Sequence, residues 1–395
     1  MLKNISSFIK NKPALAVGFL FATSSLLFGI WVASIPGIKA SLGLTDGTVG
    51  LSLLFSPLGA ISGMLISTRV FSKITVGKWM LVGYIILCCI MLLQINSVNR
   101  VMFWVSLYCF GVVSFLNGVA SNATVNIMER KFGKLMMSTC HAMYSLGGAV
   151  SAGVAALLFY LHIPSGWQIT IVAAVIISVI ISNRKHLLAN NDIIHSRSNV
   201  KFPSLTILGI SFMCMVSFMA EGCVADWSAI YFKEVLHAPK TFISLGYAGF
   251  SIAMTLGRLN GDMLFSKFGS KKLVIAGSLL ASLGFLIVVL APGIVVAIAG
   301  YILIGLGCCC TVPILFRASA NIPGLSSVEG FAMVTTGGLV GFLVGPSIVG
   351  FISEKAGLAK GLSLLILMTL LAALAAWKNK FLSNKKSTDS SLSFD

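Results

Sequence analysis

The chain has 395 residues, of which 57% are hydrophobic and only 10% are charged. Charged residues make up about 25% of an ordinary soluble domain, so this composition excludes a water-soluble globular protein. The formal net charge of +17 would suit a nucleic-acid partner, an interpretation that the positions of the basic residues can test.

Twelve apolar runs occupy almost the whole chain. A helix that crosses a bilayer needs about 20 apolar residues, and lipid admits only helices or closed barrels. The runs lack the strict alternation of barrel strands. They comprise residues 14–37, 47–69, 79–96, 101–127, 136–161, 166–183, 204–231, 242–264, 273–291, 294–316, 328–353 and 361–377. We therefore predict an all-α integral membrane protein with twelve transmembrane helices.

The basic residues are concentrated in alternate loops. With the N-terminus inside, 21 of the 28 Lys and Arg residues lie in inner segments and six in outer loops, while Arg258 lies within a run. This positive-inside bias predicts a multi-pass protein with both termini in the cytoplasm. It also accounts for the net charge, so we expect no nucleic-acid partner.

All nine cysteines lie within apolar runs, where they behave as small hydrophobic residues. They indicate no disulfide framework, and the consecutive Cys308, Cys309 and Cys310 lack the paired spacing of a zinc site. We expect neither a metal nor a cofactor.

The longest polar interruption falls at the middle of the chain and divides it six plus six. We predict an N-terminal six-helix lobe (1–183), a cytoplasmic linker (184–203), a C-terminal six-helix lobe (204–382) and a disordered cytoplasmic tail (383–395). Trp31 recurs 196 residues later as Trp227. A repeat of half the chain is typical of two-lobed transporters whose substrate site lies between pseudo-symmetric lobes.

Five ionisable side chains within the runs are candidates for function: His141, Glu221, Asp226, Arg258 and Asp262. Each costs about 2.5–3.5 kcal/mol on insertion scales, so such groups usually face a cavity or a partner. Arg258 and Asp262 are spaced i, i+4 and can pair along one helix face. Such an ion pair would form part of a gate. The alternative is that it only lowers the cost of placing two charges at the end of a membrane helix.

The segment around this pair, GRLNGDMLFSKFGSKK (257–272), resembles the signature between helices 8 and 9 of the major facilitator superfamily. Residues 31–51, 122–148 and 221–236 resemble its bacterial YbjJ/MosC-type branch. The resemblance implies the superfamily's fold, a transporter of the bacterial inner membrane and a monomer. It implies a cytoplasmic gate at Arg258, Gly261, Asp262, Lys267 and Gly269, although Ser266 stands where many members carry an aspartate.

Glu221 is the main candidate for a proton carrier, and Asp226 is the second. We expect Glu221 in the outer half of its helix, counted from residue 204, and Asp226 near the outer mouth. Desolvation favours the neutral form of a carboxyl group, so an acid exposed to each side in turn can carry protons. The alternative is a carboxyl group that hydrogen-bonds a neighbouring helix and never titrates.

Polar and aromatic side chains on the other helices are candidates for the substrate cavity. Amide side chains within a helix bundle either bind solute or hold helices together. A histidine in such a position is often a hydrogen-bonded packing residue. The two tryptophans would also suit an aromatic belt at the membrane interface. The candidates are Trp31, Asn122, Asn126, His141, Tyr144 and Trp227.

The predicted function is secondary active transport of a small polar organic solute by alternating access, coupled to protons. No GxxxxGK[ST] segment is present, which excludes a self-powered ATP pump. The alternative is an efflux pump for hydrophobic or cationic compounds. An enzyme is not expected, because the ionisable residues are scattered over three helices, and a sensor would normally add a soluble domain. The expected partners are the solute, protons and the lipid bilayer.

Overall fold

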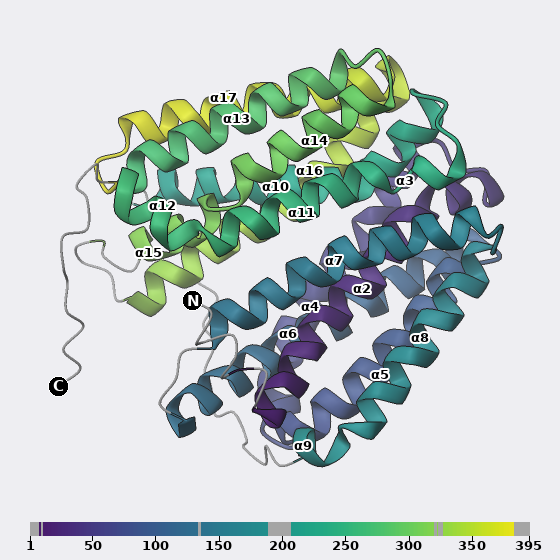
Figure 1. Ribbon diagram of the computed structural model, residues 1–395, viewed down its shortest axis with the longest axis vertical. Coiled ribbons are helices and arrows are strands. Elements are labelled where there is room, and N and C mark those ends of the chain that lie inside the picture. The colour runs from purple at the N-terminus through teal and green to yellow at the C-terminus, as the bar shows by residue number, and fades with distance from the viewer. Residues whose placement is uncertain are drawn as a thin grey trace. The chain divides into compact units, whose positions relative to one another are not determined.

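The computed structural model describes residues 8, 11–132, 136–188, 207–319, 322 and 327–382 (Figure 1). The chain divides into two compact units. Unit 1 comprises Met1–Asn199 and Ser228–Ala248, and unit 2 comprises Val200–Trp227 and Gly249–Asp395. Most of the predicted linker and the whole predicted tail lie outside the described residues, so the six-plus-six division stays a prediction.

Unit 1 is built from the helices of the first half of the chain. They are α2 (Lys12–Ser41), α3 (Asp46–Leu53), α4 (Phe55–Phe71), α5 (Val76–Ile95), α6 (Arg100–Phe132), α7 (Met137–Tyr160), α8 (Ser165–Ser182) and α9 (Arg184–Leu188). The end of α10 (Leu208–Glu234) and the short η1 (Lys240–Phe242) also belong to it. Within this unit α2 packs along α7, α4 packs on α6, and α5 packs on α6 and α8.

Small residues allow these helices to approach closely. A Cβ atom at Gly59 of α4 would collide with the carbonyl oxygen of Tyr108, and one at Gly111 of α6 would collide with that of Ser56. On the neighbouring pair, the hydroxyl of Ser151 in α7 donates a hydrogen bond to the carbonyl oxygen of Leu26 in α2. Close backbone contact and interhelical hydrogen bonds are what drive helix association in lipid, where burial of apolar surface contributes little.

Unit 2 contains the first part of α10, most of α11 (Leu245–Leu259), and the helices that follow it. These are α12 (Gly261–Phe268), α13 (Ser270–Val289), α14 (Ile294–Cys308), α15 (Thr311–Ser319), α16 (Ser327–Ala356) and α17 (Leu358–Lys378). Helix α13 lies between α14 and α17 (Figure 1). A core cluster that includes Ile210, Val274, Leu315, Val334 and Ala376 joins α10, α13, α15, α16 and α17.

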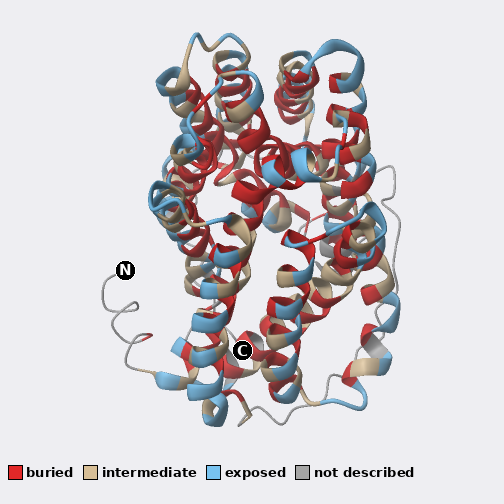
Figure 2. Cartoon of the chain, turned by 90° about the vertical axis from the view of Figure 1, so that its right-hand side faces the viewer, coloured by how far each residue is buried: buried red, intermediate tan, exposed pale blue. Residues whose placement is uncertain are grey.

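Single helices carry buried and exposed residues on different sides (Figure 2). Many exposed residues are large and apolar, among them Leu65, Val175, Leu279 and Leu374. Water would penalise so much exposed apolar surface, whereas lipid is itself apolar. The exposed faces therefore suit a bilayer as solvent.

Three predicted spans are interrupted where the sequence indicated continuous helices. The breaks fall at Leu54 between α3 and α4, at Asn260 between α11 and α12, and at Cys309 and Cys310 between α14 and α15. Asn260 has a backbone ψ of 1°, and its side-chain amide donates to the carbonyl oxygen of Leu256 at 2.9 Å. Such a local bond competes with the helical pattern.

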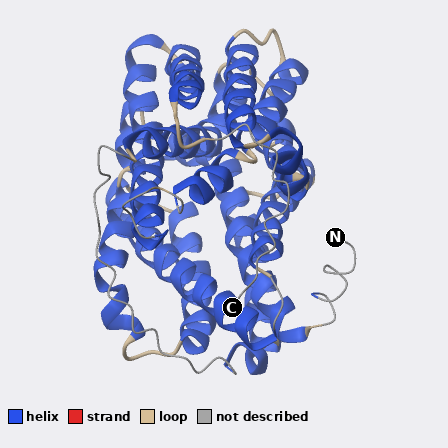
Figure 3. Cartoon of the chain, turned by 90° about the vertical axis from the view of Figure 1, so that its left-hand side faces the viewer, coloured by secondary structure: helices blue, strands red, loops and turns tan. Residues whose placement is uncertain are grey.

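All regular elements within the described ranges are helices (Figure 3). Twelve spans among them are long and apolar enough to cross a membrane, judged by length and composition. The predicted fold class, an all-α membrane protein with twelve spans, is confirmed.

Candidate functional site

An ion pair inside unit 2 joins the middle of α10 to α11. Nη2 of Arg258 donates to Oε1 of Glu221 at 3.0 Å, and the two side chains are 23% and 20% exposed. Glu221 lies 13 residues from each end of α10, which is about 20 Å at a rise of 1.5 Å per residue. The expectation of an outer-half position in the helix is wrong, because α10 runs from Leu208 to Glu234 and the predicted run was 204–231.

The partner of Glu221 was not among the predictions, which paired Arg258 with Asp262. That pairing assumed one continuous helix, whereas Arg258 lies in α11 and Asp262 in α12, on either side of the break at Asn260. The side chain of Asp262 lies outside the described part of the structure, so its own pairing stays a prediction.

The break in α11–α12 lies against the break in α14–α15. A Cβ atom at Gly257 would collide with the side chain of Cys309, and Sγ of Cys310 lies 3.8 Å from the carbonyl oxygen of Gly257. Gly257 therefore lets two interrupted spans meet one residue from Arg258. The described residues contain no group of three or more His, Cys, Asp or Glu side chains that could hold a metal ion.

The other predicted gate residues follow this break. A Cβ atom at Gly261 would lie 3.4 Å from Sγ of Cys310. Gly269 ends α12 with a φ of 76°, a left-handed value that glycine adopts without strain. Lys267 is exposed, and its Nζ lies 5.3 Å from the centroid of the Phe268 ring. A gating role for these residues stays a prediction.

Both tryptophans singled out from the sequence are buried within their own units. Trp227 is fully buried and donates from Nε1 to the carbonyl oxygen of Pro346 in α16 at 2.9 Å, while Asp226 beside it is also buried. Trp31 is 2% exposed and packs on Phe103 at a centroid distance of 5.9 Å. Both indoles therefore belong to the packed interior of their units, and a role of either one in the substrate cavity stays a prediction.

The polar candidates of unit 1 are more exposed. His141 is exposed, with its ring edge toward Phe21 at 5.2 Å, and Tyr144 is 38% exposed. Asn122 is half-buried and donates to the carbonyl oxygen of Gly118 in its own helix at 2.8 Å. The side chain of Asn126 falls outside the described part.

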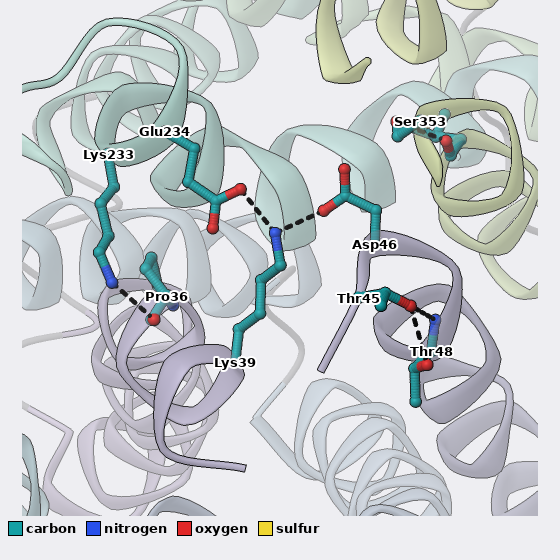
Figure 4. Close-up of polar contacts among 9 residues, drawn as sticks. Pro36, Lys39, Thr45, Asp46, Thr48, Lys233, Glu234 and Ser353 are labelled. Carbon is teal, nitrogen blue, oxygen red and sulfur yellow. Dashed lines mark hydrogen bonds and ion pairs between the residues drawn. The ribbon is translucent and has the colours of Figure 1, made fainter. Parts of the chain in front are cut away.

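A second charged group, which we call the Lys39 cluster, consists of Lys39, Asp46 and Glu234. Lys39 Nζ lies 2.6 Å from Oδ1 of Asp46 and 2.5 Å from Oε2 of Glu234, between the two carboxylates (Figure 4). The side chains of Lys39 and Asp46 are 12% and 15% exposed, and that of Glu234 is 34% exposed. Beside the cluster, Lys233 Nζ donates to the carbonyl oxygen of Pro36 at 2.9 Å.

Two further contacts hold the same stretch of chain in unit 1. Ser244 donates from its hydroxyl to the carbonyl oxygen of Ala152 in α7 at 3.1 Å. The rings of Tyr247 and Phe28 meet edge to face at 6.4 Å. Sequence reasoning missed this group, since it counted Lys39 and Lys233 only as basic residues of outer loops.

Twelve apolar spans in the described part of the chain define a multi-pass membrane protein. Residues 210–392 match the model of the Major Facilitator Superfamily. An uncharacterized MFS-type transporter of Yersinia pestis is 32% identical over 356 residues, which cover 90% of this chain and 93% of that protein. The chain therefore belongs to the major facilitator superfamily, as its resemblance indicated.

Two further proteins are similar over most of their lengths. Membrane protein MosC of Rhizobium meliloti is 27% identical over 374 residues, which cover 93% of this chain and 90% of that protein. The crystal structure of a D-xylose-proton symporter matches with a TM-score of 0.70 and 15% identity, covering 94% of this chain and 98% of that one. At that identity the match shows the fold alone.

Proposed function

We propose that the protein is a secondary active transporter of the bacterial inner membrane, with both termini in the cytoplasm. It moves a small polar organic solute by alternating access, coupled to protons, and acts as a monomer. Membership of the superfamily supports a small-molecule solute.

The observation that carries this proposal is the division of α10 between the two units. Its residues up to Trp227 belong to unit 2, whereas Ser228 and the residues after it belong to unit 1. In unit 1, Lys39 and Lys233 attach the end of α10 to α2. Partly exposed ion pairs contribute about 0.2–1 kcal/mol each, so such an attachment can break and re-form during a transport cycle.

The positive-inside bias assigns the Lys39 cluster to the outer side of the membrane. We give it the role of an outer gate, intact while the outer path is closed and broken while that path is open. Arg258, Gly261, Asp262, Lys267 and Gly269 form the corresponding cytoplasmic gate.

The proposed substrate site includes Glu221, which lies halfway along α10. Glu221 carries the proton, with Asp226 as the second candidate. Trp31, Asn122, Asn126, His141, Tyr144 and Trp227 are the candidates for solute contact, each within its own unit.

A thermal-shift screen of sugars, polyols, organic acids and amines on the purified protein tests this function. A solute that stabilises the protein is then followed in proteoliposomes, with and without an imposed pH gradient. Saturable uptake that responds to the gradient is expected. Uptake that ignores the gradient refutes proton coupling, hits restricted to hydrophobic cations favour efflux, and the absence of transport for every hit refutes the function.

A further inference from the structure

We propose that Cys309 and Cys310 form a dithiol site that binds trivalent arsenic compounds. Sγ of Cys309 lies 3.5 Å from Sγ of Cys310, at the break between α14 and α15. Both residues carry thiols in the structure. The pair belongs neither to the ion pair of Glu221 nor to the Lys39 cluster, and binding at it does not depend on the proposed function.

A second pair of consecutive cysteines shows that the sequence alone does not make this site. Cys88 and Cys89 lie within the continuous helix α5, where Cys88 is buried and Cys89 is exposed. Successive positions of a helix point about 100° apart, so these two thiols face different surroundings. At the break after α14 the two sulfurs instead contact each other.

The number of ligands selects the chemical class that the site takes. A structural zinc site needs four ligands, and the described residues contain no group of three or more His, Cys, Asp or Glu side chains that could hold a metal ion. Trivalent arsenic forms three bonds, so an arsenical that already carries one organic group needs only two sulfurs. Thiolates are also the soft ligands that soft elements prefer.

The distance between the two sulfurs agrees with such a chelate. Two sulfurs bound to one atom at about 2.3 Å lie about 4.6 Å apart in a linear arrangement, and about 3.3–3.8 Å apart at bond angles of about 90–110°. The observed 3.5 Å fits the bent arrangement, which is the geometry of trivalent arsenic, and does not fit a linear ion.

The binding reaction is a condensation without any change of oxidation state. When an arsenoxide, R–As=O, reacts with the two thiols, two As–S bonds form, the As=O bond and both S–H bonds break, and one water molecule leaves with both protons. A thiolate is the attacking form, and no oxidant is required. Cys310 is partly exposed and Cys309 is 4% exposed, so the first bond is expected at Cys310.

The site lies where the two interrupted spans of unit 2 meet. A Cβ atom at Gly257 would collide with the side chain of Cys309, and one at Gly261 would lie 3.4 Å from Sγ of Cys310. An organic group added at this contact overpacks it, and overpacking shifts the surrounding backbone. A bound arsenical therefore displaces the segment beside Arg258, and under the proposed function it stops transport.

Intact-mass measurement of the purified full-length protein with phenylarsine oxide tests the site. One variant keeps only Cys309 and Cys310, with the other seven cysteines replaced by alanine, and a matched variant keeps only Cys88 and Cys89. The first is expected to gain one phenylarsine group per chain, which excess glutathione leaves in place and 2,3-dimercaptopropanol removes. The second should gain none that withstands glutathione.

Single replacements in the otherwise wild-type chain keep the test decisive if a multiple variant fails to fold. Cys309→Ala and Cys310→Ala should each lose one glutathione-resistant phenylarsine group relative to wild type, whereas Cys88→Ala should lose none. A resistant group on the chain that keeps only Cys88 and Cys89, none on the chain that keeps only Cys309 and Cys310, or no loss in Cys309→Ala would overturn the site.

Counterflow of the transported solute in proteoliposomes tests the consequence for transport. Phenylarsine oxide should abolish counterflow by the variant that keeps only Cys309 and Cys310, and 2,3-dimercaptopropanol should restore it. Continued counterflow by a fully labelled chain would refute the inhibition and leave the binding site in place. Absence of counterflow before labelling, for every solute, would refute the proposed function and not the site.

Discussion

The replacement Lys39→Gln should open the end of α10 away from α2. It removes two ion pairs, with Asp46 and Glu234, and it leaves those two carboxylates facing each other without a cation. Ion pairs that are partly exposed contribute about 0.2–1 kcal/mol each. Only the pair with Glu234 joins α2 to α10, and it favours the attached state by about 0.2–1 kcal/mol. The detached population should therefore rise by a factor of about 1.4 to 5.

Spin labels at Ser41→Cys and Val235→Cys, in a background without native cysteines, measure this population by double electron–electron resonance. Both positions are exposed and lie near the cluster on its two sides. The long-distance population should grow in Lys39→Gln, grow less in Glu234→Gln, and grow in wild type when the salt concentration is raised.

Arg100→Gln is the matched control. Arg100 donates to the carbonyl oxygen of Gly43 at 2.9 Å, so its loss removes one positive charge beside α3 without touching α10. Its distance distribution should equal that of wild type. If Lys39→Gln and Arg100→Gln give the same distribution, the Lys39 cluster does not hold α10 and the reasoning is refuted.

Four further variants test the packing within each unit. Trp227→Phe loses the hydrogen bond that the buried indole donates to α16, which should cost about 1–3 kcal/mol; an unchanged melting temperature in detergent would contradict this. Gly111→Leu should sharply lower the yield of folded protein, because its side chain would meet the backbone of α4, whereas Gly118→Leu on the same helix has open space and should be tolerated. Gly269→Ala places a side chain at a φ of 76° and should cost about 1 kcal/mol, measured as a lower melting temperature with no change in solute affinity.

The twelve spans were predictable because lipid imposes a simple rule on the chain. Each crossing must be long, apolar and internally hydrogen-bonded. The first two conditions are visible in hydropathy, and the third then requires a helix. The interruptions at Leu54, Asn260 and Cys309 were not predictable in the same way. An apolar run looks the same whether its helix is continuous or broken, and the break depends on what packs against it, as Cys309 packs against Gly257.

The candidate site was predictable only in its components. Glu221 and Arg258 stand out as charges within apolar runs, but sequence spacing assigns Arg258 to its local neighbour and says nothing of a partner 37 residues away. Lys39 and Glu234 are 195 residues apart, so no local pattern links them. The position assigned to Glu221 along its helix was wrong because it depended on helix ends that hydropathy defines only to within a few residues.

Reversible cross-linking at the Lys39 cluster tests alternating access most directly. Lys39→Cys and Glu234→Cys, in a background without native cysteines, are bridged by a short bismethanethiosulfonate reagent in proteoliposomes, and counterflow of the solute found by thermal shift is measured. Bridging should stop transport and reduction of the bridge should restore it. Transport that continues at the same rate with α10 bridged to α2 would contradict a cycle in which this attachment must break.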